Sequence, residues 1–143
     1  MAANHQLAVA THILLVLAHI PDDYRNTNGL VSSKVVAASV NTNAVVIRRV
    51  VAQLAGHGLV RSHSGKGGGL ELGRPAGRIT LLDIYTALSE PEVFAYKANL
   101  PSPRCPIGSR VIDVLSPVFT EAQSSVHRSL KKTTLADLVA RIA

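Results

Sequence analysis

The chain is 143 residues long and basic, with 15 Lys and Arg against 9 Asp and Glu and a formal net charge of +6. At 47% hydrophobic and 17% charged residues, it has the composition of one globular domain, or of a domain with an appendage, and not of a disordered chain. An aromatic content of 3% without tryptophan argues against the stacking platforms that bind single strands and RNA loops.

The first predicted element is a helix over residues 6–20, because Leu7, Ala10, Leu14 and Leu17 recur on one helical face. Its apolar run of about 14 residues is shorter than the roughly 20 that a membrane-spanning helix needs. No basic segment precedes it and no small-residue cleavage site follows it. We therefore expect neither a membrane span nor an export signal, and a cytoplasmic protein.

After a polar loop at residues 21–29, the sequence predicts two helices separated by a tight break. The first covers residues 34–39, after serines that are good N-caps. Asparagine and threonine at residues 41–43 then compete for backbone hydrogen bonds and end it. The second runs to about residue 55, where glycines stop it. Its core-facing residues are Val46, Ile47, Val50, Val51 and Leu54.

A glycine-rich hairpin follows the second helix. Residues 59–62 read as a short strand, GKGGG at residues 65–69 as the turn, and residues 70–72 as the returning strand. Helix, turn, helix and basic hairpin together predict a winged helix-turn-helix. In such a unit the second helix enters the major groove of DNA, and the hairpin tip approaches phosphate.

The positive charge is concentrated in this unit. Between residues 24 and 80 there are eight Lys and Arg against a single acid, Glu71, whereas the rest of the chain holds seven against eight. The eight are Arg25, Lys34, Arg48, Arg49, Arg61, Lys66, Arg74 and Arg78. Many small helical domains contain a helix, a turn and a helix, but this basic field favours a nucleic-acid partner.

The C-terminal third predicts three further helices. Thr80 caps a helix over residues 81–89, prolines keep residues 91–106 irregular, and a long helix covers residues 107–130 with Pro106 at its start. A short helix over residues 135–142 ends the chain. We divide the chain into a winged-helix DNA-binding domain at residues 1–90, and a dimerisation helix with a C-terminal cap at residues 91–143. The expected fold is thus mainly α with a small β-hairpin wing.

The long helix carries a narrow apolar seam that we expect to mediate dimerisation. Its residues, spaced by three or four, are Val111, Leu115, Val118, Ala122 and Val126. The alternative is packing of the seam within its own monomer. A partner chain is favoured because the rest of the protein is small.

Several sequence segments resemble the Rrf2 family of bacterial transcription regulators. They are VNTNAVVIRRVVAQLAGHGLV, SGKGGGLELGRP, ITLLDIYTAL, CPIGSRVIDVL and the late TTLADL. The resemblance covers nearly the whole chain, and the glycine-rich hairpin followed by LGRP and ITLLDI is its most specific part. It implies a winged helix with a long dimerisation helix, usually in a homodimeric repressor. Several family members sense iron–sulfur status, nitric oxide or thiol conditions.

The candidate DNA contacts are polar or basic residues near helix N-termini and at the hairpin tip. For base edges they are Thr42, Asn43 and Arg48, with Val45 for a thymine methyl. For phosphate they are Ser33, Lys34 and Arg49, and in the hairpin His63, Lys66 and Gly67. Any one of them could instead cap a helix or form a surface ion pair.

Cys105 is the only cysteine, which excludes an intrachain disulfide. At the start of a helix and near Arg104 and Arg110, its thiol pKa could be lowered, and Cys105 is a possible redox sensor. The alternative is a small buried apolar residue. Family members with an iron–sulfur cluster generally use three cysteines in this region. One cysteine does not supply such a ligand set, and we predict no metal and no cofactor.

The sequence therefore predicts a sequence-specific regulator of double-stranded DNA, acting as a homodimeric repressor that responds to a redox signal or a small effector. An alternative is a winged-helix module that binds protein and not DNA. No catalytic arrangement of residues is recognisable, so we do not expect an enzyme.

Overall fold

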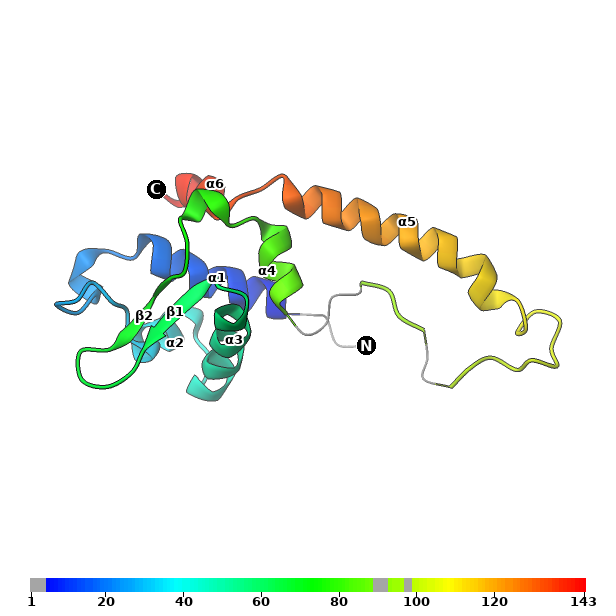
Figure 1. Ribbon diagram of the computed structural model, residues 1–143, viewed down its shortest axis with the longest axis horizontal. Coiled ribbons are helices and arrows are strands. Elements are labelled where there is room, and N and C mark those ends of the chain that lie inside the picture. The colour runs from blue at the N-terminus through cyan, green and yellow to red at the C-terminus, as the bar shows by residue number, and fades with distance from the viewer. Residues whose placement is uncertain (1–4, 89–92, 97–98) are drawn as a thin grey trace.

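The computed structural model describes residues 5–88, 93–96 and 99–143. The described chain is mainly helical with one two-stranded antiparallel hairpin, which confirms the predicted fold class (Figure 1). The longer elements are α1 (Gln6–His19), α2 (Ser33–Val40), α3 (Ala44–Gly56), β1 (Val60–His63), β2 (Gly69–Leu72), α4 (Leu81–Ala87), α5 (Val111–Lys131) and α6 (Leu135–Ile142). Three-residue 3-10 turns, η1 (Asp22–Tyr24) and η2 (Ala76–Arg78), join some of them.

The hydrophobic core is built around α1. Its residues Ala10, Ile13, Leu14 and Leu17 are buried, and α2, α3, β2, α4 and α6 all pack against this helix. The core consists almost entirely of aliphatic side chains, among them Ile47 from α3. Because α1 is surrounded on most sides, its sequence is apolar beyond one narrow stripe.

Side-chain caps define the turn between α2 and α3. The Ser32 hydroxyl accepts a hydrogen bond from the Val35 backbone amide at 3.2 Å. The side-chain oxygen of Asn43 accepts one from the Val46 backbone amide at 3.0 Å. Asn41 ends α2 in the left-handed conformation, with φ of 60°. The chain bends by 109° between the two helices, within the range of helix-turn-helix motifs.

The hairpin is joined to the segment that leads into α2. β1 and β2 pair antiparallel with Val60 opposite Leu72 and His63 opposite Gly69. Val31 forms an isolated bridge with Leu70, with N···O distances of 3.0 and 2.7 Å. This bridge was not predicted, and it ties the hairpin to the start of the helix-turn-helix.

The C-terminal helix folds back onto the winged unit. The Leu135 amide donates to the Ile79 carbonyl at 2.8 Å, the Leu81 amide donates to the Thr133 carbonyl at 2.9 Å, and the Leu135 side chain is fully buried. The predicted domain boundary at residues 90–91, like the predicted end of α4 at Ser89, lies outside the described residues. The division of the chain stays a prediction.

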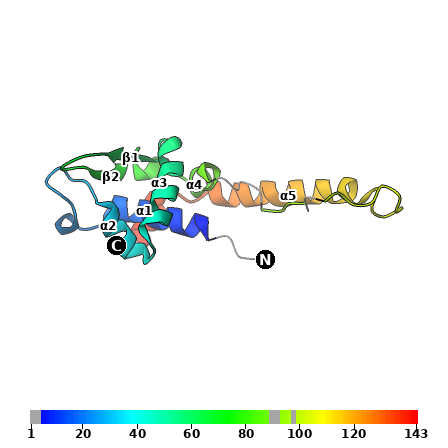
Figure 2. The same ribbon diagram turned by 90° about the horizontal axis from the view of Figure 1, so that it is seen from below.

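Helix α5 begins at Val111, so its predicted start at residues 106–107 is wrong. The preceding residues form turns, in which the Ser109 amide donates to the Cys105 carbonyl at 2.9 Å. Gly108 lies so close to the backbone of Ser102 that a Cβ there would meet the Ser102 oxygen at 2.7 Å. This close approach holds the segment in compact turns. Figures 1 and 2 show α5 projecting away from the rest of the molecule.

Among the residues that the structure describes, no single helix is long and apolar enough to cross a membrane, and α2 with α3 would reach that length only as a sharply bent pair.

Candidate nucleic-acid interface

The helix-turn-helix and the hairpin lie on one side of the molecule, away from α5 (Figure 1). Helix α3 buries Ile47, Val50 and Leu54, which orients its opposite face outward. Val45 on that face is 57% exposed, and Arg48 is also exposed. The amphipathic pattern of α3 therefore presents its N-terminal half to solvent, as a recognition helix requires.

The predicted contact residues of the two helices come together around the turn. Ser33 and Lys34 are exposed in the first turn of α2, and Thr42 is half-buried between the helices. Asn43 is exposed, but its carbonyl oxygen already accepts the capping hydrogen bond of α3. Asn43 thus has a structural role, and its contact with a base stays a prediction.

Four cations of this surface are exposed and have no ion pair or side-chain hydrogen bond within residues 5–88, 93–96 and 99–143. They are Lys34, Arg48, Arg49 and Lys66. We call these four residues the unpaired cations. Their charge is available to a polyanion, because nothing described in the chain neutralises it.

Three of the other four cations of the basic field are engaged within the protein, and the fourth, Arg78, is exposed. Arg25 donates to the Leu17 carbonyl at 3.0 Å and lies 3.8 Å from Asp22, and its side chain is largely buried. Arg61 lies 3.8 Å from Glu71, and Arg74 lies 3.8 Å from an Asp83 carboxylate oxygen. The sequence count therefore overstates the positive charge that is free to meet a ligand.

The hairpin tip exposes Lys66 on a backbone that needs glycine. Gly65 and Gly67 have φ of 84° and 77°, the left-handed region that favours glycine. A Cβ at Gly68 would overlap the carbonyl oxygen of His63. The predicted tip residues Lys66 and Gly67 are both exposed, so backbone and ammonium group can approach a duplex together.

His63 is exposed but not free. Its Nε2 lies 3.1 Å from Glu71 Oε2 across the hairpin. Glu71, the single acid of the basic field, is thereby held between His63 and Arg61 on the wing strands.

Sequence reasoning missed the residues that hold the hairpin tip in place. The side-chain NH2 group of Asn26 donates to the backbone carbonyls of Gly67 and Gly68 at 3.1 and 2.8 Å. The side-chain NH2 group of Asn28 donates to the Gly67 carbonyl at 2.9 Å. The Asn26 oxygen in turn accepts from the amides of Asn28 and Leu30. We call Asn26 and Asn28 the wing clamp. The signal available was the Asn-Thr-Asn-Gly run, since asparagine readily binds backbone groups in loops.

Cys105 lies in the turns that precede α5 and is exposed, so the buried alternative is wrong. The backbone amides of Gly108 and Ile107 lower the pKa of its thiol. The predicted cause, the N-terminus of a helix opening at Pro106, is corrected by the later start of α5. Turn amides favour the thiolate instead.

The apolar seam runs along a helix that has no buried residue. Val118 is 60% exposed, whereas Val111, Leu115, Ala122 and Val126 are partly buried. Phe119 of α5 contacts Phe94, and Gln123 bonds the Val93 amide and the Tyr85 hydroxyl of α4. The described chain thus leaves Val118 open and covers the other four seam residues in part.

Comparison with known proteins agrees with this geometry. The profile of the Rrf2 family, described as an iron-dependent transcriptional regulator, matches residues 3–141. YwnA of Bacillus subtilis (strain 168), named as a candidate HTH-type transcriptional regulator, is 33% identical over 137 residues, which are 95% of this chain and 96% of YwnA.

Solved structures show the same architecture. A candidate transcriptional regulator from Lactobacillus plantarum is 28% identical with a TM-score of 0.75, over 96% of this chain and 89% of that one. CymR of B. subtilis, titled the global cysteine regulator, superimposes with a TM-score of 0.66 over 99% of this chain and 98% of its own. At 24% identity, CymR shows the fold alone.

The iron of the family description has no evident ligand set here. The part of the chain that the structure describes contains no group of three or more His, Cys, Asp and Glu placed to hold a metal ion. Cys105 is the only cysteine of the sequence. The residues of one chain therefore do not fit a cluster held by cysteine thiolates.

Proposed function

Because the chain belongs to the Rrf2 family of DNA-binding transcriptional regulators, we propose that it is a homodimeric, sequence-specific repressor acting in the cytoplasm. The family consists of regulators and not of enzymes. The observation that carries the proposal is the set of four unpaired cations, which lie on α2, α3 and the wing. These are the elements that meet DNA in a winged helix.

Base readout is assigned to the exposed N-terminal half of α3. Arg48 can donate two hydrogen bonds to guanine, and Val45 can contact a thymine methyl. Thr42 and Asn43 stand at the same end of the helix. The side-chain oxygen of Asn43 caps α3, and its side-chain NH2 group can still donate to a base.

Phosphate contacts are assigned to the surrounding groups. Ser33 and Lys34 at the start of α2 and Arg49 on α3 flank the reading residues, and Lys66, Gly67 and His63 extend the surface along the wing. Such contacts position the protein and release counterions, so they make affinity fall with salt. They contribute little to sequence preference.

Dimerisation is assigned to the seam of α5. Burying the seam against a second copy would remove the exposed Val118 side chain from water, and apolar burial is favourable by about 25 cal/mol per Å². A two-fold axis would place two recognition helices for half-sites about one helical turn of DNA apart. Repression then follows if the dimer occupies duplex that other proteins need.

The signal is proposed to be thiol oxidation at Cys105 or a small effector. Exposure and a lowered thiol pKa both increase the reactivity of Cys105. No step is assigned to iron, since the residues of one chain do not fit a thiolate cluster. The absence of a cofactor stays a prediction.

The test is a titration of fluorescent duplex from the region upstream of the coding sequence, followed by anisotropy at several salt concentrations. Arg48→Ala should weaken specific binding by roughly ten-fold or more, since a bidentate base contact is worth about 1–3 kcal/mol. Arg104→Ala removes the same charge from an exposed turn outside the helix-turn-helix, and it should bind as wild type does.

No binding to any duplex at low salt would contradict the proposal and favour a protein-interaction module. Equal losses in Arg48→Ala and Arg104→Ala would contradict the assignment of base readout to α3, because net charge alone would then set the affinity.

A further inference from the structure

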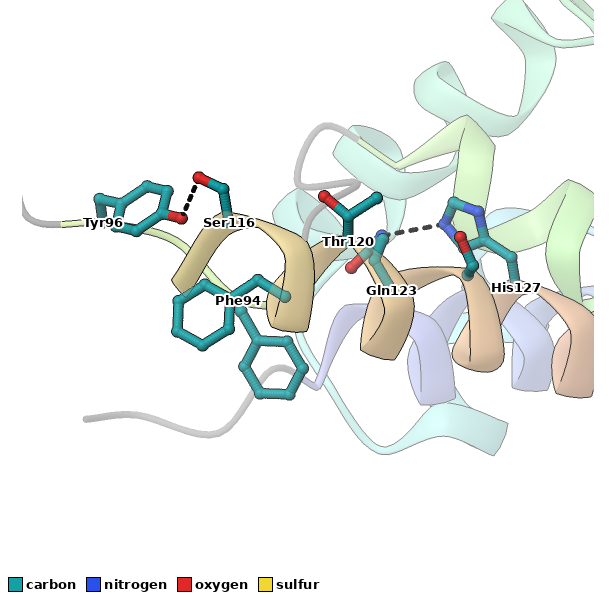
Figure 3. Close-up of a pocket in the computed structure, with 8 residues that line it drawn as sticks. Phe94, Tyr96, Ser116, Thr120, Gln123 and His127 are labelled. Carbon is teal, nitrogen blue, oxygen red and sulfur yellow. Dashed lines mark hydrogen bonds between the residues drawn. The ribbon is translucent and has the colours of Figure 1, made fainter. Parts of the chain in front are cut away.

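A small pocket lies between α5 and residues 93–96 (Figure 3). Its volume is about 270 Å³. Phe94 and Tyr96 approach from the extended segment, and the remaining lining comes from α5, namely Ser116, Phe119, Thr120, Gln123, Ser124 and His127.

The aromatic residues of the chain are concentrated here. The sequence has two Phe and three Tyr, and three of these five rings line the pocket, while Tyr85 lies edge-on to His127 with ring centroids 5.8 Å apart. The ring of Phe119 lies 5.4 Å from that of Phe94 and 5.5 Å from that of Tyr96. These rings are not core residues, since Phe94 is 45% and Tyr96 is 42% exposed. Exposed aromatic clusters favour contact with a planar partner.

The polar lining of the pocket consists of hydroxyl, amide and imidazole groups. Tyr96 Oη lies 2.8 Å from Ser116 Oγ (Figure 3). The side-chain oxygen of Gln123 accepts a hydrogen bond from the Val93 amide at 2.8 Å. The hydroxyls of Thr120 and Ser124 also line the space. None of the described lining residues is Lys, Arg, Asp or Glu, so the site does not favour a charged ligand.

The pocket connects to the DNA-binding unit through α4. Gln123 Nε2 lies 2.9 Å from His127 Nε2 and donates to the Tyr85 hydroxyl at 3.4 Å. Tyr85 is buried in α4, and α4 packs against α1 and the recognition helix α3. A molecule seated at Gln123 would therefore act on the junction between α5 and α4.

Dimerisation through the seam would leave the pocket open. Successive helical residues are turned by about 100°, so the seam at Val118 and Ala122 and the pocket at Thr120 and Gln123 occupy different faces of α5, with Phe119 between them. One helix can thus serve a partner chain on one face and a ligand on another.

We propose that this pocket binds a small, uncharged, planar aromatic molecule with one or two hydrogen-bonding substituents, and that occupancy changes the affinity for DNA. The regulatory part rests on the proposed DNA-binding function. A ligand shifts DNA affinity only by its differential affinity for the two arrangements of α5 and α4. Without a ligand, the rings fasten residues 93–96 onto α5.

The test uses phenol and benzamide as probes, with cyclohexanol and benzoate as non-aromatic and charged comparators, in ligand-observed NMR titrations of the full chain. Both aromatic probes should bind saturably, and both comparators at least ten-fold more weakly. Phe119→Leu, which keeps an apolar side chain but removes the ring, should weaken probe binding at least ten-fold. Tyr24→Leu removes an exposed ring outside the pocket and should leave probe binding unchanged.

Thr120→Val provides a second variant, because Thr120 is exposed and its replacement should not disturb folding. It should weaken benzamide binding several-fold. Absence of saturable binding, or binding that Phe119→Leu does not change, would overturn the site and leave the rings as internal packing only.

Duplex affinity is measured in the same samples. Saturating phenol should change it several-fold in wild type and not in Phe119→Leu, and an unchanged affinity would overturn the regulatory part. If the wild-type protein does not bind duplex in the absence of a probe, the proposed function is contradicted. The NMR titration still tests the pocket, because it detects probe binding without DNA.

Discussion

Asn26 shows how one side chain can position the wing. It donates to two carbonyls at the hairpin tip, 41 and 42 residues away in sequence, and accepts two amides of its own loop. Asn26→Ala should destabilise this contact by about 1–2 kcal/mol, since each net hydrogen bond contributes roughly 0.5–1.5 kcal/mol and the site is exposed. Hydrogen exchange of the wing amides should accelerate, and duplex affinity should fall several-fold.

The matched control for the wing clamp is Asn99→Ala, at an exposed position outside the winged unit. It should leave the hydrogen exchange of the wing amides and the duplex affinity unchanged. Unaltered wing exchange in Asn26→Ala would show that the hairpin holds its position without the clamp.

Cys105 provides a prediction for pH. Its folded pKa is lowered by turn amides, so at a given pH the folded protein holds more thiolate than the unfolded chain. The alkylation rate with iodoacetamide should therefore rise with pH at a lower midpoint in buffer than in strong urea. Because the lowered pKa favours the folded state at high pH, this stabilisation is lost as pH falls through the folded value. Identical midpoints would contradict the role of the turn.

Contacts between residues that are close in sequence were predictable, whereas contacts between residues far apart in sequence were not. The caps at Ser32, Asn43 and Thr80 bind amides only three residues away, so a short sequence pattern specifies them. The Asn26 contact joins segments that meet only in the folded chain. Nor could the sequence distinguish Arg25, which is tied to α1, from the unpaired Arg48.

Among elements, the helices with clear periodicity were predicted to within about two residues, as α3 and α6 show. Helix α5 was not, because Pro106 is locally suited to a helix start while the contact of Gly108 with Ser102 depends on tertiary structure. The return of α6 to the core also has no sequence signal that separates it from a peripheral cap.

The seam of α5 carries the element-scale prediction. Val118→Glu would place two carboxylates in the proposed interface of each dimer, where burial without a partner is costly. The dissociation constant of the dimer should rise at least 100-fold in analytical ultracentrifugation, with helix content unchanged. Val118→Ile keeps the seam apolar and should dimerise as wild type does. A Val118→Glu protein that dimerises equally well would place the interface elsewhere.

At the scale of the whole molecule, the last helix stabilises the DNA-binding unit. Leu135 is fully buried in the core shared with α1, although it lies 54 residues after Leu81 on the adjoining α4. Leu135→Ala should lower the free energy of unfolding by about 2–5 kcal/mol, the usual cost of such a cavity. Ile142→Ala, at a position that is 60% exposed, should cost far less.

Thermal unfolding of both variants, followed by the circular dichroism of the whole chain, tests this role of α6. A single transition that shifts strongly in Leu135→Ala indicates that α6 and the winged unit unfold together. An unshifted main transition would mean that α6 is a peripheral cap.

The central claim is that two copies of the unpaired cations read a two-fold symmetric duplex. The most direct measurement is selection from a pool of randomised duplexes by the purified protein at physiological salt, followed by sequencing. The account predicts enrichment of an inverted repeat with half-site centres about 10–10.5 base pairs apart, and no such enrichment by Arg48→Ala. Failure of the wild-type protein to enrich any motif would contradict it.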